Sequence, residues 1–211
     1  MLFGAAVSQL PTCVAAIDHL GKHLGLGLNQ GRFAIAAIDA IKPGGECIPA
    51  MNEYGRITGI PESDSNEFSA FPQSASAIRI DLNTRLRLTH NNQRITQAPS
   101  FELLIARLLG RIKNLSDLYG ESELISGPEK QELIDQAKSI SMPSQNIEWS
   151  DWSRYSGRQK EWMKFGGLLG TITYQGNLEP FLPWLALGEW THIGGKTSFG
   201  LGKYSFETEN I

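Results

Sequence analysis

A run of glycines near the C-terminus constrains the fold of this chain more than any other feature. Between an apolar, helix-like segment and a final strand lie four glycines, Gly194, Gly195, Gly200 and Gly202. Glycine has no Cβ, so the backbone can take positive φ there and other atoms can approach it closely. Backbone N–H groups could then bind a polyanion, with Lys196 as a point charge. The alternative is a flexible turn between helix and strand, since short glycine motifs are common.

Composition narrows the class of protein. The chain has 211 residues, 41% of them hydrophobic and 19% charged, which is enough for one large or two small domains. A net charge of −3 argues against broad, nonspecific nucleic-acid binding but leaves room for a local basic face. Cys13 and Cys47 lack metal-site spacing and predict a reducing, cytoplasmic setting. No apolar run approaches the length of a membrane span, so we expect no membrane partner.

Residues 1–40 predict an incomplete unit. A short strand is expected at residues 2–7, a helix over residues 11–24, and a second strand over residues 32–38 after a glycine-rich turn. Two strands and one helix cannot cover both faces and edges of a sheet. We therefore expect either that a preceding segment is missing or that a second chain completes the unit.

A linker and a more complete unit follow. Residues 41–76 are rich in glycine and proline and carry an acidic, serine-bearing stretch, so they predict a linker or long loop. Residues 77–211 predict an α+β unit with the ferredoxin-like order β–α–(α)–β–β–α–β. Its expected elements are strands at 77–88, 147–153, 168–175 and 203–208, and helices at 101–119, 128–140 and 179–189.

Basic and aromatic residues alternate across a predicted hairpin. Arg154, Arg158 and Lys164 are interleaved with Tyr155 and Trp162. Arginine and lysine can bind phosphates, and aromatic rings can stack on unpaired bases. The alternative is an ordinary solvated loop whose tryptophans belong to the core.

Three arginines occupy the polar side of the strand at residues 77–88. They are Arg79, Arg85 and Arg87. They either add to the same basic face or line a solvated sheet, and the sequence favours neither alternative.

The four histidines differ in their surroundings. His19 and His23 have a helical spacing that can bind a metal, but no third ligand lies near them in the sequence, so a structural role is favoured. His90 lies in a turn and is expected to face solvent. His192 directly precedes the glycine-rich turn, where a phosphate could lie, or it orients that turn as a helix-end residue.

Four blocks of the C-terminal part follow one another in the chain: residues 149–159, 163–170, 176–183 and 187–204. In this order and spacing they resemble the C-terminal half of the CRISPR-associated repeat-RNA endoribonucleases of the RAMP superfamily. A less specific block at residues 2–33 is similar to the end of the family's first domain. The resemblance implies a tandem ferredoxin-like (RRM-like) RAMP fold whose first copy is incomplete. Residues 1–40 would then be the second half of the first domain, residues 41–76 the linker, and residues 77–211 the complete second domain.

The resemblance also implies a function. In this family a ribose 2′-hydroxyl attacks the adjacent phosphate without a metal or cofactor, which requires a base and positive charge on the phosphate. His192 would be the base and Lys196 the charge stabiliser. The expected RNA-binding residues are Arg154, Arg158, Lys164, Gly194, Gly195, Lys196, Thr197, Ser198, Gly200, Gly202 and Lys203.

The partners implied are CRISPR repeat RNA, other CRISPR-associated proteins and a second copy of the chain. Two alternatives to processing stay open. One is a noncatalytic RNA-binding RAMP subunit of an effector complex. The other is an inactive, truncated fragment, because in many members of the family the catalytic histidine is carried by the first domain.

Overall fold

The computed structural model describes residues 8–209 except 28, 43–45, 53–54, 59–73, 121 and 158. The chain divides into two compact units, residues 1–67 and 68–211. The strand expected at residues 2–7 and the candidate Arg158 lie outside the described residues. Within the described residues, no helix is both long and apolar enough to cross a membrane.

The first unit contains one helix and one strand pair. Helix α1 (Leu10–His19) continues as a π-helical turn, η2 (Leu20–Leu24), so the helix expected over residues 11–24 is confirmed. Strand β1 (Asp39–Ile41) pairs antiparallel with β2 (Cys47–Pro49), which lies in the segment expected to be a linker or long loop.

The strand expected over residues 32–38 is wrong. In the described part of the chain these residues pair with no strand, and β1 begins only at Asp39. The segment instead lies against the preceding helix, because the Phe33 N–H donates to the Gly21 carbonyl at 3.3 Å. A Cβ at Gly21 would lie only 2.3 Å from the Phe33 carbonyl oxygen, so the absence of a side chain permits this approach.

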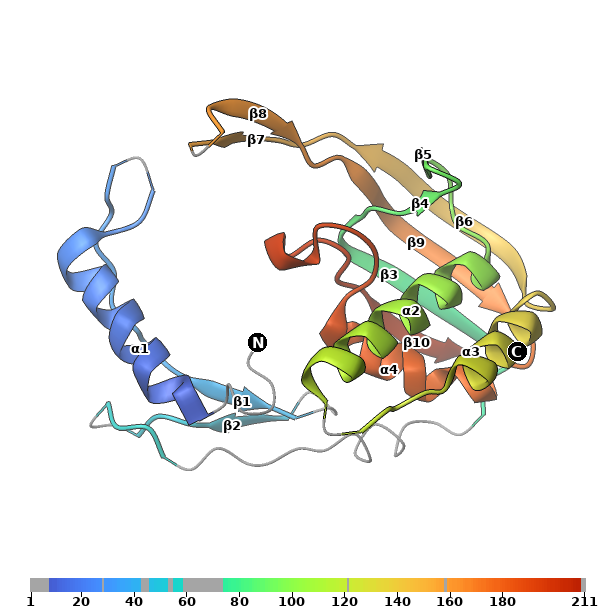
Figure 1. Cartoon of the computed structure of the whole chain (residues 1–211), viewed down its shortest axis with the longest axis horizontal. Helices are drawn as coiled ribbons and strands as arrows, with labels where there is room; N and C mark the ends of the chain where they lie inside the picture. Colours follow the sequence, from blue (N-terminus) through green and yellow to red (C-terminus); the bar gives the residue numbers. More distant parts are fainter. Residues whose placement is uncertain are drawn as a thin grey trace. The chain divides into compact units, whose positions relative to one another are not determined.

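The second unit is built on a four-stranded antiparallel sheet. Its strands are β3 (Ala77–Leu86), β6 (Ser141–Ser150), β9 (Gly167–Gln175) and β10 (Ser205–Glu209), in the spatial order β10-β3-β9-β6 (Figure 1). Its helices are α2 (Phe101–Tyr119), α3 (Gly127–Ala137) and α4 (Leu182–Thr191), with a short 3-10 turn, η4 (Glu179–Phe181), before α4. This order and connectivity confirm the predicted α+β, ferredoxin-like arrangement.

Two small hairpins extend from the sheet. Strands β4 (Thr89–His90) and β5 (Gln93–Arg94) form one, turned by Asn91 and Asn92 with positive φ. Strands β7 (Ser153–Ser156) and β8 (Glu161–Lys164) form the other. The β7–β8 hairpin is the one over which basic and aromatic residues alternate.

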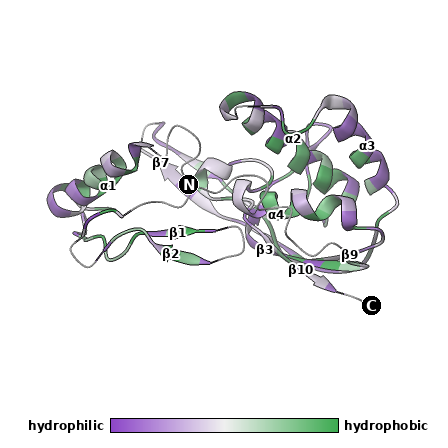
Figure 2. Ribbon diagram, turned by 90° about the horizontal axis from the view of Figure 1, so that it is seen from below, coloured by the Kyte–Doolittle hydropathy of each residue, from purple (hydrophilic) through white to green (hydrophobic). Residues whose placement is uncertain are grey.

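The core lies between the sheet and the helices that cover one of its faces (Figure 2). Alternate residues of β3, including Ile78 and Ile80, are buried against it, as the period of two predicts. Leu104, Leu108 and Ile112 supply the matching buried stripe of α2. The rigid sheet and α2 therefore hold the loops at their ends in defined positions.

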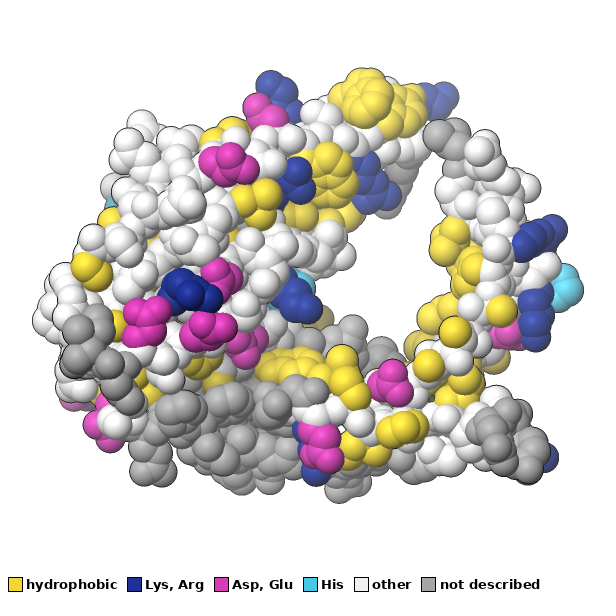
Figure 3. Space-filling view, turned by 180° about the vertical axis from the view of Figure 1, so that it is seen from behind, with side chains coloured by type: hydrophobic (Ala, Val, Ile, Leu, Met, Phe, Trp, Pro, Cys, Tyr) yellow, Lys and Arg dark blue, Asp and Glu magenta, His cyan; other side chains and the backbone are white. Residues whose placement is uncertain are grey.

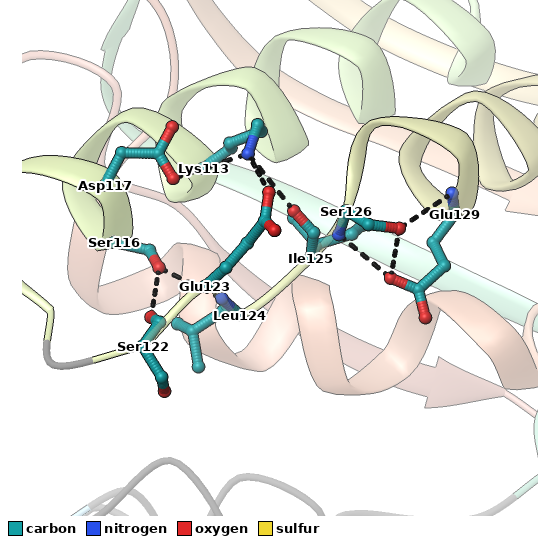
Figure 4. Close-up of polar contacts among 9 residues, drawn as sticks. All are labelled: Lys113, Ser116, Asp117, Ser122, Glu123, Leu124, Ile125, Ser126 and Glu129. Atoms are coloured by element: carbon teal, nitrogen blue, oxygen red, sulfur yellow. Dashed lines mark hydrogen bonds and ion pairs between the residues drawn. The ribbon is translucent and has the colours of Figure 1, made fainter.

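Polar contacts fix α3 beside α2 (Figure 4). Ser126 caps α3: its hydroxyl accepts from the Glu129 N–H at 3.4 Å, and the Glu129 carboxylate accepts from the Ser126 N–H at 2.9 Å. The Ser116 hydroxyl of α2 accepts from the Leu124 N–H at 3.0 Å. Lys113 forms ion pairs with two carboxylates of the same region. The first turn of α3 is thereby held at a fixed place along α2.

Glu189 couples α4 to the last strand and makes stability depend on pH. Its carboxylate accepts from the Phe206 N–H at 2.9 Å, and burial raises its pKa. The pKa of Glu189 is higher in the folded state than in the unfolded state. Between these two pKa values folding therefore takes up a proton, and the free energy of unfolding falls as the pH rises through that range. Glu189→Gln keeps the acceptor and removes the buried charge. We therefore expect a higher Tm than wild type at about pH 7 and a smaller difference at about pH 4.

Thermal unfolding of the full chain at the two pH values measures this effect. Glu148→Gln, at an exposed position of β6, is the matched control and should leave both Tm values unchanged. A lower Tm for Glu189→Gln at neutral pH would show that the carboxylate is net stabilising.

Candidate nucleic-acid interface

The glycine-rich loop packs closely on the end of β3. Gly194 has φ +84°, and a Cβ there would lie 2.4 Å from the Arg87 carbonyl oxygen. Gly202 has φ +75°, and a Cβ there would lie 1.8 Å from the Ile193 carbonyl oxygen. Both distances are shorter than any real Cβ contact, so these two glycines allow the loop to close on itself and on the strand.

Several amides that we expected to bind phosphate are already used. The Gly195 N–H donates to the Arg87 carbonyl at 2.8 Å, and the Gly202 N–H donates to the Arg85 carbonyl at 3.0 Å. The Gly200 N–H donates within the loop itself at 2.9 Å. The expected cradle of open backbone amides is therefore wrong at these three positions, because their hydrogen bonds hold the loop together.

Three aromatic rings from separate segments meet beside the loop. The Phe165 ring lies 5.0 Å from the Phe199 ring, with an interplanar angle of 82°, and 5.1 Å from the Trp152 ring, at 62°. Phe165 is fully buried, whereas Phe199 is 44% and Trp152 is 38% exposed. Edge-to-face packing of this kind is a preferred aromatic geometry. Phe199 lies in η5 (Thr197–Phe199), a 3-10 turn inside the glycine-rich loop.

Three cations lie over these rings. Lys196 Nζ is 5.2 Å from the centroid of Phe165 and 5.8 Å from that of Phe199. The Arg154 guanidinium is 5.3 Å from Phe199, and that of Arg85 is 5.6 Å from the Trp152 ring. Such cation–π contacts hold the charges in place without neutralising them. We call the six residues the aromatic–basic cluster: Arg85, Trp152, Arg154, Phe165, Lys196 and Phe199.

The β7–β8 hairpin continues the cluster with exposed rings. Tyr155 and Trp162 lie opposite each other, with ring centroids 5.6 Å apart, and are 49% and 71% exposed. Figure 3 shows hydrophobic and basic side chains side by side over this part of the surface. Lys164 is exposed at the end of β8. The alternative that places Trp162 in the core is therefore wrong, and the hairpin offers rings to solvent as a stacking platform would.

His192 lies at the end of α4, outside the aromatic–basic cluster. Its φ of 61° and ψ of 170° place a non-glycine residue in a region that is almost exclusive to glycine. The Nδ1 atom lies 3.2 Å from the Leu201 carbonyl oxygen, so the tautomer with a proton on Nδ1 leaves Nε2 as an acceptor. Burial lowers the pKa of His192, and the positive charges of Lys203 and Arg111 lower it further. The imidazole is thus held neutral at neutral pH.

The remaining candidates occupy the loop and its flanks. Ser198 is exposed and Thr197 half-buried in η5. Lys203 is exposed, and its N–H donates to the Thr84 hydroxyl at 2.8 Å. The rings of Phe165 and Phe199 were not predicted as part of the site, although the position of Phe199 among glycines was a usable signal.

The three arginines predicted on one strand separate into two groups; Arg79 and Arg85 lie in β3, and Arg87 directly follows it. Arg79 forms ion pairs with Asp81 at 3.2 Å and Glu207 at 2.8 Å, so its charge is already partnered. Arg85 belongs to the cluster, and Arg87 donates to the Lys164 carbonyl at 3.0 Å. Of the three arginines, only the two at and just after the C-terminal end of β3 can therefore add to the basic surface beside the glycine-rich loop.

The histidine pair of the first unit lacks further ligands in the structure. The His19 and His23 rings lie 4.5 Å apart, and among the described residues no group of three His, Cys, Asp or Glu side chains could hold a metal ion. His90 is exposed in the β4–β5 hairpin, as expected.

Fold and site together define an RRM-like domain with a basic, aromatic face beside a glycine-rich loop. The sequence profile of the CRISPR-associated endoribonuclease Cas6 matches residues 79–204, more than half of the chain. The chain therefore belongs to the Cas6 family. No curated protein sequence is significantly similar to it.

Solved Cas6 structures share the fold. Thermus thermophilus Cas6 (TTHB231) superposes with a TM-score of 0.53 and 16% identity, covering 69% of this chain and 58% of that one. The product complex of the same Cas6 gives a TM-score of 0.53 and 14% identity, covering 69% and 56%. A partial Cas6-RT-Cas1–Cas2 complex gives 0.47 and 18% identity, covering 67% and 24%. The chain thus spans less than two thirds of each of these structures.

Proposed function

We propose that this chain binds CRISPR repeat RNA and takes part in its metal-independent endonucleolytic processing. Membership of the Cas6 family supports the substrate class. The observation that carries the proposal is the convergence of Lys196 and Arg154, from different segments, on the half-exposed ring of Phe199. Fixed cations beside an accessible ring match the two chemical features of an unpaired nucleotide, its phosphate and its base.

In cleavage by 2′-hydroxyl attack, the 2′-oxygen bonds to phosphorus as the bond from phosphorus to the 5′-oxygen breaks. The step needs a base for the 2′-hydroxyl proton, a cation near the scissile phosphate and a proton for the departing 5′-oxygen. His192 is a neutral imidazole whose Nε2 can accept the 2′-hydroxyl proton, because Nδ1 faces the Leu201 carbonyl. Lys196 can stabilise the charge that develops on the phosphate. Arg154, Lys164, Thr197, Ser198 and Lys203 would position the strand.

The test uses labelled repeat RNA with the full chain in EDTA. We expect site-specific cleavage and an affinity that falls as salt rises, because cation–phosphate contacts release counterions. Phe199→Ala should weaken binding about 5- to 150-fold, the loss of one base stack. Phe199→Leu is the matched control for packing against Phe165: it should fold as wild type yet bind as weakly as the alanine variant. Salt-insensitive binding, or equal affinity of Phe199→Ala and wild type, would contradict the proposal.

The alternative function is a noncatalytic RNA-binding RAMP subunit. It is favoured by the position of His192 outside the aromatic–basic cluster. Binding without cutting in the same assay supports this alternative, and neither binding nor cutting supports an inactive fragment.

The unit boundaries and partners are also proposals. We propose that residues 1–40 end a first ferredoxin-like domain, that residues 41–76 link it to the second, and that residues 77–211 form that second domain. We also propose that other CRISPR-associated proteins are partners, which membership of the Cas6 family supports.

A further inference from the structure

A second basic surface lies on the helical side of the second unit. A groove of about 600 Å³ runs between α2, the end of β3 and the start of the glycine-rich loop. Four of the residues that line it are cations, and none is acidic. The four are Arg87, Arg107, Arg111 and Lys130. In a chain of net charge −3, this concentration of positive charge requires an explanation.

Backbone carbonyl oxygens orient two of the groove's cationic side chains, and no acidic side chain forms an ion pair with any of the four within the described residues. Arg107 donates to the Thr89 carbonyl at 2.7 Å and Arg111 to the Thr191 carbonyl at 2.5 Å, so neutral backbone oxygens orient both guanidinium groups. Within the described residues, the ion pairs involve other cations, and none of the four groove cations takes part in one. Guanidinium groups have five donors, so each retains donors for an anion.

The floor of the groove is kept open by a glycine inside a helix. Gly110 lies in the middle of α2, where glycine costs about 1 kcal/mol relative to alanine. A Cβ at this position would lie 3.6 Å from Lys130 Nζ, so a longer side chain would enter the space between α2 and that ammonium group. At one end of the groove Tyr119 is 71% exposed and offers its ring to solvent.

The groove continues from the aromatic–basic cluster. Gly195 lines the groove, and the next residue, Lys196, belongs to the cluster. Arg87 lines the groove and donates to the Lys164 carbonyl at the base of the β7–β8 hairpin. The groove and the cluster thus adjoin in the chain at Gly195 and Lys196, and none of the residues that line the groove or form the cluster is acidic.

We propose that this groove binds a single-stranded, phosphate-bearing segment of RNA that extends beyond the part bound at the aromatic–basic cluster. Arg107, Arg111 and Lys130 contact its phosphates, and Tyr119 stacks on a base. The inference rests on the proposed function, because it assigns a second contact to the same substrate.

The experiment compares a repeat-RNA hairpin alone with the same hairpin carrying a single-stranded extension at its 5′ or 3′ end. Wild type should bind one of the extended RNAs more tightly. The double variant Arg107→Gln, Lys130→Gln should lose this gain but bind the bare hairpin as wild type does. On the extended RNA, the slope of log affinity against log salt concentration should be smaller in magnitude by about 1.4 than for wild type, because two phosphate contacts are lost. A charge-matched control, Lys22→Gln with Lys138→Gln, removes two cations outside the groove and should keep the gain.

A steric variant tests the groove without changing charge. Gly110→Leu should abolish the gain from the extension, whereas Gly110→Ala should keep it, and circular dichroism checks that both remain folded. Equal affinity of wild type for bare and extended hairpins would overturn the inference, as would an unchanged gain in the groove variants. Failure of the proposed function is distinguishable from this, because wild type would then bind neither RNA.

Discussion

Replacing Gly202 with alanine is expected to cost more than about 3 kcal/mol of folding free energy, enough to unfold much of a marginally stable unit. The new Cβ would lie 1.8 Å from the Ile193 carbonyl oxygen, and the backbone φ of +75° adds strain for any L side chain. Relief would require moving a hydrogen-bonded pair, because the Ile193 N–H donates to the Gly202 carbonyl at 2.9 Å. Urea unfolding of the full chain, followed by tryptophan fluorescence, measures the loss.

Gly200 provides the matched control for backbone strain alone. Its φ of +82° is similar to that of Gly202, but a Cβ there would meet nothing within 4 Å. Gly200→Ala should therefore cost only about 1–2 kcal/mol, the penalty of the left-handed conformation. Equal losses at the two positions would show that the loop yields easily around Gly202 and that its close approach to Ile193 is not tight.

The contrast between these glycines shows where sequence reasoning reaches its limit. Glycine spacing correctly predicts a loop with positive φ, since that freedom is a property of the residue itself. The same freedom serves close packing and ligand binding equally well. Whether the Gly202 N–H faces a phosphate or the Arg85 carbonyl depends on where β3 lies, and only the folded structure decides that.

The helices and strands were predictable from the sequence wherever their apolar residues recur with a regular period. The alternation at Ile78 and Ile80 and the helical spacing from Leu104 to Ile112 both correspond to buried faces in the structure. Strand β6 instead begins at Ser141, before the expected start at residue 147. Its first six residues are exposed at the edge of the sheet and only Met142 and Pro143 among them are apolar, so no alternating pattern marks them.

Cationic residues of the candidate site could be predicted from the sequence, but the side chains that they contact could not. Arg154 and Lys196 were identified from their residue type, their aromatic and glycine neighbours and the family resemblance, because such cations suit a polyanion. That both would approach Phe199 depends on how the β7–β8 hairpin lies beside the loop, which no local pattern encodes. Conversely, Arg79 looked equivalent to Arg85 along the strand, yet Glu207 on the adjacent strand pairs with it.

His192→Ala is expected to slow cleavage of repeat RNA by about 10²- to 10⁴-fold while leaving RNA affinity within about twofold, as for loss of a general base. The physical reason is the fixed Nδ1 contact to the Leu201 carbonyl, which leaves Nε2 to accept a proton. Because burial lowers the His192 pKa, protonating the imidazole requires a more acidic solution than for an unperturbed histidine. The wild-type rate should therefore hold near pH 7 and fall on the acid side, at a lower pH than an unperturbed histidine base would give, as the base becomes protonated.

A loss of cleavage through misfolding would look similar, and His192→Gly separates the two explanations. The backbone at position 192, with φ 61° and ψ 170°, costs a non-glycine residue on the order of 1–3 kcal/mol. His192→Gly should therefore be more stable than His192→Ala in urea, yet equally slow in cleavage. Recovery of activity in the glycine variant would assign His192 a purely structural role at the end of α4. Unchanged cleavage in both variants would place the general base elsewhere.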